Sequence, residues 1–441
     1  MTPMDNENLV RHLSEMIRIP TVSSFDGDED KETFAAFRDY LKRTYPHTWE
    51  KGEPRLIGKC GLLYKISGRS KEGPSVLMAH YDVVPADPAA WDFEPFAGDI
   101  AEGSLRGRGS LDTKGTLCAI LEAVEAHLAS GGTFAHDLYL SFSGEEEVEG
   151  SSSKEMAHTL EKEGVRPALV LDEGGAVIPE GLPFVPGLAA MVGIAEKGVA
   201  NVRLTLKGKG GHASVPPKHT TLGRLAKAAA AIEAHPFKTR LTGPVVDMFH
   251  FIGKKKGGPV GFACRHVSLF SLPVRWLASR MGGTFAAMVR TSCAVTMMEG
   301  SPSYNILPET STLGVNLRVL PGETLEGALD HLKSVIADPE ISIEVVSGGG
   351  PSGISKAEGE SWEKLCRAVS SVWPKAMTVP YTLNGGTDSR AWHGICDHVY
   401  KFTPMVMSAS DRAMVHGLNE AIRLESLGET ALFYRYLVRE L

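Results

Sequence analysis

The chain has 441 residues, more than one compact core usually holds, and its length fits two or three domains. Hydrophobic residues make up 43% and charged residues 22%, as in ordinary soluble globular proteins. The net charge of -7 and the pI near 6.1 give no electrostatic sign of nucleic-acid binding, which usually needs a basic face.

The chain shows no sign of a targeting or membrane segment. The N-terminal sequence MTPMDNENLVRHLSEMIRIP lacks the charged and then apolar pattern of a secretory signal. No apolar run reaches the roughly 18 residues that span a bilayer. The six cysteines are scattered without a CxxC pair, which favours free buried thiols over a disulfide framework. We therefore expect a cytoplasmic protein with neither a membrane nor a nucleic-acid partner.

The first 196 residues are typical of an α/β fold. Residues 5–18 and 32–45 carry apolar side chains at helical spacing. The runs SVLMAH, DLYLSFSG and PALVLDEGG are short and apolar, as strands are in a sheet covered on both faces. A third helix is predicted over 113–128, between the first two runs. Strands that alternate with helices predict a mostly parallel sheet with helices on both faces.

The pattern changes near Gly198. ANVRLTLKGKG, SCAVTMMEG and STLGVNLRVLP alternate apolar and polar residues, as half-exposed strands do, and ISIEVVSGGG ends this series. Helical patterns lie among them at 222–233 and 325–336. These features predict an inserted α+β domain over 197–348, which divides the first domain into 1–196 and 349–441. Residues 236–290 are predicted to be an insertion in that domain, with a helix near 272–281.

Polar side chains follow the apolar runs. Ligands of open α/β sheets bind at the carboxyl ends of the strands, so the residues after each run are candidates for a site. These residues are His80 and Asp82 after the first run, Asp112 at a glycine-rich turn before a helix, Glu145, Glu146 and Glu147 after the second run, Asp172 and Glu173 after the third, and His416 near the C-terminus.

Several carboxylates in one place repel each other, and their pKa values rise. A divalent cation removes this repulsion, and two cations account better for the excess of acids. Imidazole and carboxylate ligands without thiolate suit zinc, with cobalt or manganese as substitutes. Two such ions share a carboxylate and activate one water. One further acid must then stay unligated to accept the proton of that water.

Each candidate also has an ordinary structural explanation. A histidine at the end of a strand is more often structural than a ligand. A run such as GEEEVEG is usually a solvated turn, and an aspartate that opens a helix, such as Asp112, is usually a cap. Because all of these residues occur together and in this order, the separate structural explanations account poorly for the whole set.

The motifs MAHYDVVPA, WDFEPFAGDIAEGSLRGRGSLDTKG, GEEEVEG, LDEGG, GKGGHAS, SYNILPE, GGTDSR and MVHGLNE span nearly the whole chain. Together they resemble the co-catalytic zinc metallopeptidase family that includes carboxypeptidase S, aminoacylase, glutamate carboxypeptidase and succinyl-diaminopimelate desuccinylase. The sequence departs from the family at Glu149, where glycine is usual. The region 236–290 is longer than the corresponding region of the shortest family members. In this respect the chain resembles the carboxypeptidase S branch.

The resemblance implies a zinc-binding first domain that holds two Zn²⁺ ions, with Co²⁺ or Mn²⁺ as substitutes. Asp82 is implied as the partner that orients His80, and Glu146 as the general base, while Glu145 occupies a non-ligand position. A cis peptide bond is expected between Asp112 and Thr113. The implied metal ligands are His80, Asp112 as the bridging carboxylate, Glu147, Asp172 and His416.

The resemblance implies that the inserted domain is a lid and dimerisation domain. His212 in GGHAS is implied to stabilise an oxyanion, often in the partner subunit's site, which makes a homodimer the expected state. Asn305 and Arg390 are implied to bind the carbonyl or carboxylate of the substrate, and Arg318 is a further candidate. Arg390 has a second interpretation, as an ion-pair partner of Asp388. Arginine suits a carboxylate because its guanidinium donates two parallel hydrogen bonds.

The predicted protein is therefore a di-zinc metallopeptidase that cleaves small peptides as a carboxypeptidase or dipeptidase. An N-acyl-amino-acid deacylase or desuccinylase has the same chemistry and stays open as an alternative. Two other classes are a metal-binding or ligand-binding protein without activity and a purely structural oligomer. The presence of Glu146 beside all five expected ligands argues against the former, and the latter leaves the acids at the strand ends unexplained.

Overall fold

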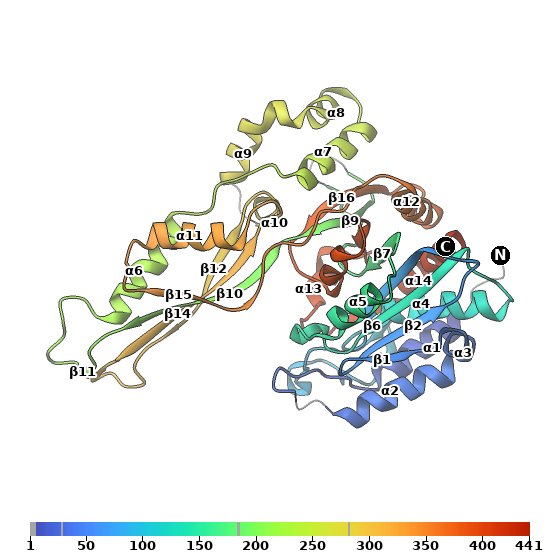
Figure 1. The fold of residues 1–441 in the computed structure, drawn as a ribbon, viewed down its shortest axis with the longest axis horizontal. Helices are drawn as coiled ribbons and strands as arrows, with labels where there is room; N and C mark the ends of the chain where they lie inside the picture. Colours follow the sequence, from blue (N-terminus) through green and yellow to red (C-terminus); the bar gives the residue numbers. More distant parts are fainter. Residues whose placement is uncertain (1–5, 28–29, 183–185, 281–282) are drawn as a thin grey trace. The chain divides into compact units, whose positions relative to one another are not determined.

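The computed structural model describes residues 6–27, 30–182, 186–280 and 283–441, and Figure 1 shows their fold. The chain forms two compact units. Unit 1 comprises residues up to 194, 355–380 and 387–441, and unit 2 comprises residues 195–354 and 381–386. Residues 195–354 of unit 2 thus lie between two parts of unit 1 in the chain, whereas the sequence predicts an inserted domain over 197–348.

The main sheet of unit 1 has nine strands in the order β1-β2-β6-β3-β7-β17-β9-β16, and β8 pairs with β9. The strands are β1 (Arg55–Ile57), β2 (Gly61–Ile66), β3 (Ser70–His80), β6 (His136–Ser143), β7 (Leu169–Asp172), β8 (Val177–Ile178), β9 (Ala189–Glu196), β16 (Met377–Leu383) and β17 (Val399–Lys401). Strands β6, β3, β7 and β17 run parallel to one another. Antiparallel pairing joins β2 to β6 and β9 to β17, so the sheet is mixed with a parallel centre.

The helices of unit 1 cover both faces of this sheet. They are α1 (Asn6–Ile17), α2 (Lys31–Thr44), α3 (Pro46–Gly52), α4 (Lys114–Ala129), α5 (Ser152–Lys162), α12 (Glu360–Val372), α13 (Ala409–Met414) and α14 (Leu424–Glu440). The 3-10 helices η1 (Pro88–Ala90), η2 (Glu146–Val148) and η4 (Asp388–Gly394) lie in the connections. The short strands β4 (Ile100–Ala101), β5 (Ser104–Arg106) and β18 (Ala421–Arg423) form a separate small sheet.

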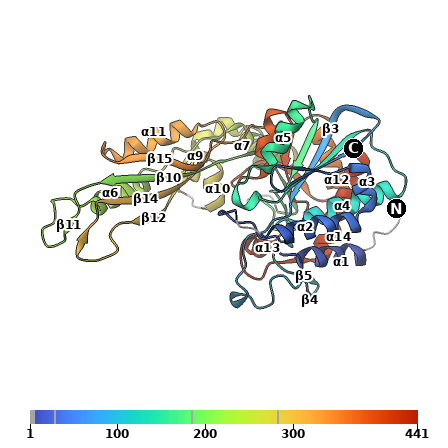
Figure 2. The same ribbon diagram turned by 60° about the horizontal axis from the view of Figure 1, so that its bottom comes forward.

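Burial on both faces explains the apolar run before His80. Val76 and Met78 pack against Met156 of α5 and Trp392 of η4. Leu77 points to the opposite face of the sheet because side chains alternate along a strand, and α4 contacts β3 there. Figure 2 shows α1, α4 and α14 together on one side of unit 1 and α5 on the other. The sheet therefore carries His80 at the end of a strand that is fixed from both sides.

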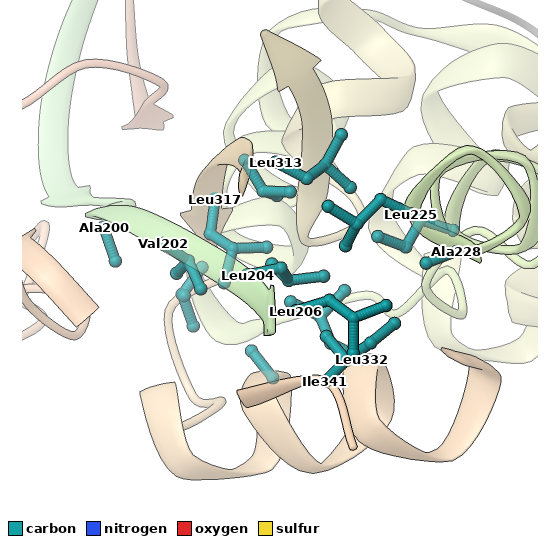
Figure 3. Close-up of a cluster of buried hydrophobic side chains, with 14 residues drawn as sticks. Ala200, Val202, Leu204, Leu206, Leu225, Ala228, Leu313, Leu317, Leu332 and Ile341 are labelled. Carbon is teal, nitrogen blue, oxygen red and sulfur yellow. The ribbon is translucent and has the colours of Figure 1, made fainter. Parts of the chain in front are cut away.

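Unit 2 is built on a four-stranded antiparallel sheet in the order β12-β14-β10-β15. Its strands are β10 (Gly198–Lys207), β12 (Ser292–Glu299), β14 (Thr310–Val319) and β15 (Ser342–Gly348), and β11 (Gly211–His212) pairs separately with β13 (Ile306–Leu307). Helices α6 (Thr221–Ala234) and α11 (Leu325–Ile336) cover one face. Figure 3 shows their Leu225 and Leu332 against Leu204 and Leu206 of β10.

The predicted insertion at 236–290 is helical. It contains α7 (Gly243–Lys255), α8 (Gly258–Arg265), the 3-10 helix η3 (Val267–Phe270), α9 (Ser271–Arg280) and α10 (Gly283–Met288). These helices contact one another in chain order, and Figure 1 shows α7, α8 and α9 grouped together. Within the described residues, every helix is too short or too polar to cross a bilayer.

Candidate metal centre

His80 ends β3 with its imidazole buried. Its Nδ1 lies 3.0 Å from the backbone oxygen of Asp82 and 3.4 Å from the Oδ1 atom of the same residue. Its Nε2 lies 3.0 Å from Oδ1 of Asp112 and 3.2 Å from Oε1 of Glu173. One ring nitrogen is thus held by the loop that follows the strand, and the other points at two carboxylates.

His416 approaches the same aspartate from the C-terminal part of the chain. Its Nε2 lies 3.1 Å from Oδ2 of Asp112 and 2.9 Å from Oε2 of Glu147. The φ angle of His416 is 57°, so the backbone turns in the left-handed region at this residue. The imidazole is 53% exposed, which leaves this side of the group open to solvent.

Asp112 joins the two groups of ligand atoms. One group consists of His80, Asp112 and Glu173, and the other of Asp112, Glu147 and His416. The two oxygens of Asp112 face different histidines. If two cations were bound, Asp112 would be a ligand that the two groups share. The peptide bond between Asp112 and Thr113 is cis, which confirms the expectation from the sequence.

Asp82 fixes both the histidine and the acidic turn. Its Oδ1 accepts a hydrogen bond from the backbone N–H of Glu146 at 3.2 Å, and its Oδ2 accepts one from that of Glu147 at 3.1 Å. The same carboxylate lies beside Nδ1 of His80. The His-x-Asp spacing predicts that Asp82 orients the histidine, and its hydrogen bonds to the backbone of the two glutamates are an additional contact that the sequence did not suggest.

The three glutamates of the acidic run have different environments. Glu145 precedes η2, and its Oε1 reaches the start of α5, where it accepts hydrogen bonds from the N–H groups of Ser151 and Ser152. Glu147 faces His416, as described above. Glu146 belongs to neither ligand group, but its Oε2 lies 4.0 Å from Nε2 of His80. Burial and the neighbouring acid Glu173 raise the pKa of Glu146 well above its usual value, against the influence of His80.

Asp172, which the sequence predicts as a ligand, has its carboxylate directed at backbone donors in this structure. Both of its carboxylate oxygens accept backbone hydrogen bonds, Oδ1 from Glu173 at 2.9 Å and Oδ2 from Ser389 at 2.8 Å. Glu173 is the residue whose carboxylate reaches Nε2 of His80. Successive side chains point in different directions where β7 ends, so Glu173 enters the site and Asp172 fastens the following turn to η4.

Sequence reasoning also missed Glu420, which is fully buried. Its Oε1 accepts hydrogen bonds from the N–H groups of Leu111 and Asp112, and its Oε2 accepts them from the N–H of Gly109 and from Nη1 of Arg108. The Nη2 of Arg108 donates to the backbone oxygen of Gly417. A carboxylate at the end of MVHGLNE is the sequence signal that points to this residue.

The acidic run contains one further departure that the structure explains in part. Glu149 stands where the related family usually has glycine, and its φ angle is 53°. This is the left-handed region, in which glycine meets no steric penalty. The turn keeps its shape here with a glutamate, since the backbone N–H of Glu149 donates to the oxygen of Glu146.

The donor set fits divalent cations. Burial would raise the pKa of Asp112, but hydrogen bonds from His416 and His80 hold it well below its usual range. Hydrogen bonds to Asp112 and Glu147 raise the pKa of His416 to about 10. Both shifts have the same cause, which is that positive charge between these carboxylates is favourable. A cation bound by unprotonated imidazoles would supply the same charge, and the mixed nitrogen and oxygen donors suit zinc, cobalt or manganese.

The other predicted site residues lie elsewhere in the two units. In unit 2, His212 and Asn305 are brought together, since His212 pairs with Ile306 and the N–H of Ala213 donates to the oxygen of Asn305. Arg318 is eight residues beyond Thr310 on β14, roughly 27 Å from that end of the sheet. Arg390 lies in η4 of unit 1, next to the Ser389 that binds Asp172.

The fold and the two ligand groups define a metal-dependent hydrolase. Residues 76–440 match the model of peptidase family M20/M25/M40, and the chain belongs to this family. It is 30% identical to the N-fatty-acyl-amino acid synthase/hydrolase PM20D1 of Xenopus tropicalis over 441 residues, which cover 99% of this chain and 86% of that protein. It is also 30% identical to the probable carboxypeptidase S-like 1 of Dictyostelium discoideum, over 98% of this chain and 86% of that protein.

Solved structures agree on the fold. The M20 family metallo-carboxypeptidase Sso-CP2 from Sulfolobus solfataricus has a TM-score of 0.72 at 19% identity, with 98% of each chain covered. Human carnosine dipeptidase 1 has a TM-score of 0.64 at 16% identity, over 99% of this chain and 96% of that chain. The predicted fold class, an α/β sheet domain with a separate antiparallel sheet domain, is confirmed.

Proposed function

We propose that this hydrolase contains two zinc ions and cleaves the amide bond between an acyl group and an amino acid whose carboxylate is free. The observation that carries the proposal is the pair of ligand groups that share Asp112, with Glu146 held beside them but in neither. When bound, the two cations would polarise the scissile carbonyl and make a water more acidic.

The chain's own residues carry the proton and hold the site in shape. Glu146 accepts the proton of the attacking water and delivers it to the leaving amine, a role that its raised pKa supports. The carboxylate of Asp82 contacts His80 and accepts a hydrogen bond from the backbone of Glu146, so it holds the two residues in fixed positions relative to each other. His80, Glu173, Asp112, Glu147 and His416 are the proposed ligands. The resemblance assigns His212 to the oxyanion and Asn305 and Arg390 to the substrate's carbonyl or carboxylate, and these roles are part of the proposal.

Two substrate classes satisfy this description. The carboxypeptidase S-like relatives support small peptides, which is the preference expected from the sequence. The PM20D1 relatives support N-acyl amino acids with a fatty acyl group. Both classes have a free carboxylate next to the scissile amide and differ in the group on the carbonyl side.

We propose also that the protein is a homodimer, as the resemblance implies, and that it is cytoplasmic, which its six free cysteines support.

The test is a measurement of bound metal together with hydrolysis of two matched substrates. N-oleoyl-phenylalanine and alanyl-phenylalanine share the leaving amino acid and differ in the acyl side, and phenylalanine amide derivatives of both serve as controls without the carboxylate. We expect close to two zinc ions per chain, loss of turnover on chelation and recovery with zinc. Full activity after exhaustive chelation would rule out the proposed chemistry. Equal cleavage of the amide controls would rule out recognition of the carboxylate.

A further inference from the structure

The helical insertion of unit 2, defined here as residues 243–280, exposes large apolar side chains. Leu269, Leu272 and Trp276 are 79%, 74% and 59% exposed, and Phe262, Phe270 and Leu277 are exposed as well. Five of these six lie within residues 269–277. Single exposed apolar residues are common on protein surfaces, but a dense group marks a surface that binds something.

This exposure does not come from a poorly packed segment. Val245, Ile252, Val267 and Ala278 are buried, and they lie on α7, η3 and α9. The backbone N–H of His266 donates to the oxygen of Phe262, and Arg265 donates through Nη1 to the oxygen of Gly253, which ties α8 to α7. The insertion is therefore an ordered helical segment with buried as well as exposed apolar side chains.

The charge of the insertion is opposite to that of the chain. Residues 243–280 contain six basic residues, of which Lys254 and Lys255 are adjacent and exposed, and one acid, Asp247. The insertion thus carries a net charge of +5, whereas the whole chain carries -7. The guanidinium of Arg280 lies 4.8 Å from the ring centroid of Trp276, so a cation and an exposed aromatic ring are neighbours.

We propose that the helical insertion docks on the surface of an anionic lipid bilayer. Trp, Leu and Phe side chains enter the interface of a bilayer, while Lys and Arg side chains bind the anionic headgroups. A second copy of the chain is a poorer occupant, because two insertions of charge +5 would repel each other. The docked helices lie on the membrane and do not span it, in keeping with their length and polarity. This proposal departs from the expectation of no membrane partner, which concerned signal and spanning segments.

The test is cosedimentation of the full-length, zinc-loaded protein with vesicles. One set contains phosphatidylcholine alone, and the other contains phosphatidylcholine with 30% phosphatidylglycerol. We expect binding to the anionic vesicles only, and its loss in high salt. The variant Lys254→Gln/Lys255→Gln removes two charges and is expected to weaken partitioning about 30-fold. Leu272→Ser/Trp276→Ser is expected to weaken it at least about tenfold.

Matched controls separate this surface from general effects. Lys227→Gln/Lys333→Gln removes two exposed charges from α6 and α11 of the same unit, and Phe25→Ser removes an apolar side chain that is 83% exposed in unit 1. Both controls are expected to bind as the unmodified protein does. Absence of binding to anionic vesicles overturns the proposal, and so does equal binding by all variants. A change in sedimentation velocity with the apolar variant, without vesicle binding, would identify an interface between copies of the chain.

If the apolar variant fails to fold, the lysine variant still tests the proposal. Lys254 and Lys255 are exposed, so their replacement by glutamine leaves the buried side chains of the insertion unchanged. Circular dichroism spectra and unfolding temperatures of every variant verify the fold. The readout is vesicle binding and needs no turnover, so its outcome is separate from that of the proposed hydrolase activity.

Discussion

Oε2 of Glu146 lies 4.0 Å from Nε2 of His80, while Glu147 of the same turn faces His416 and is the proposed ligand. The substitution Glu146→Gln preserves the size of the side chain and removes its capacity to accept a proton. We expect kcat to fall by about 100-fold to 10,000-fold, the usual contribution of a general base. The zinc content, measured by atomic emission, should stay unchanged. A variant that keeps more than a tenth of the turnover would show that another group accepts the proton.

Asp172 and Glu173 are adjacent acids with different partners, and this makes them a matched pair. We expect Glu173→Ala to lose the zinc ion of the His80 group, because it removes one of three ligand side chains. Asp172→Asn retains an oxygen for one of its two backbone N–H partners and should keep both ions. Zinc titration by isothermal calorimetry measures this difference. Loss of zinc from the asparagine variant alone would identify Asp172, and not Glu173, as the ligand.

For single residues, the sequence predicts which residue types form the site better than it predicts the directions in which their side chains point. The order of the motifs places His80, Asp112, Glu147 and His416 in one site, and the structure brings these four together. The choice between Asp172 and Glu173 depends on how the chain turns after β7. The N–H of Ser389 donates to Oδ2 of Asp172, and the N–H of Gly174 donates to the hydroxyl oxygen of Thr403. Those partners lie more than 200 residues further along the chain, so no local pattern contains the information.

Glu420 and Arg108 hold two loops of unit 1 together. One loop connects β5 to α4, and the other is the turn after His416. The substitution Glu420→Gln removes the negative charge beside a buried guanidinium. We expect a loss of about 3–5 kcal/mol in the free energy of unfolding, the usual effect of breaking a buried ion pair. Urea denaturation at a fixed zinc concentration measures it.

The control for this prediction is Glu102→Gln. Glu102 also pairs with an arginine, Arg106, but its side chain is almost fully exposed. Exposed pairs contribute little to stability, so the control should unfold at the same urea concentration as the unmodified protein. Equal and small losses in both variants would mean that Glu420 does not stabilise the loops.

The elements themselves follow the sequence to different degrees. The helix expected at 113–128 is α4 (Lys114–Ala129), and the helix expected near 272–281 is α9 (Ser271–Arg280). The small sheet of β4, β5 and β18 was not predicted, because strands of two or three residues are too short to show a period of two. The antiparallel edges of the main sheet were missed because strand direction depends on connections, not on the composition of a strand.

In the whole molecule, most of unit 2 is one long segment, residues 195–354, inserted into unit 1, and residues 381–386 complete it. Residues 195–354 contain a complete core, in which Val202, Leu204 and Leu206 of β10 pack under α6 and α11. We expect this segment, expressed alone, to fold and to unfold cooperatively in urea, as measured by circular dichroism and amide hydrogen exchange. Weak protection of the β10 and β14 amides would contradict an independent fold, and the intact chain supplies the reference protection.

Strand order has a consequence for synthesis of the chain on the ribosome. Strand β17 lies between β7 and β9, but it is translated only after all of residues 195–354. The nascent chain therefore carries an open sheet, with β7 and β9 unconnected, while the inserted unit already has everything it needs to fold. His416 emerges later still. The second ligand group is therefore complete only once His416 has been translated, and a chain that ends before Val399 would lack both β17 and this histidine.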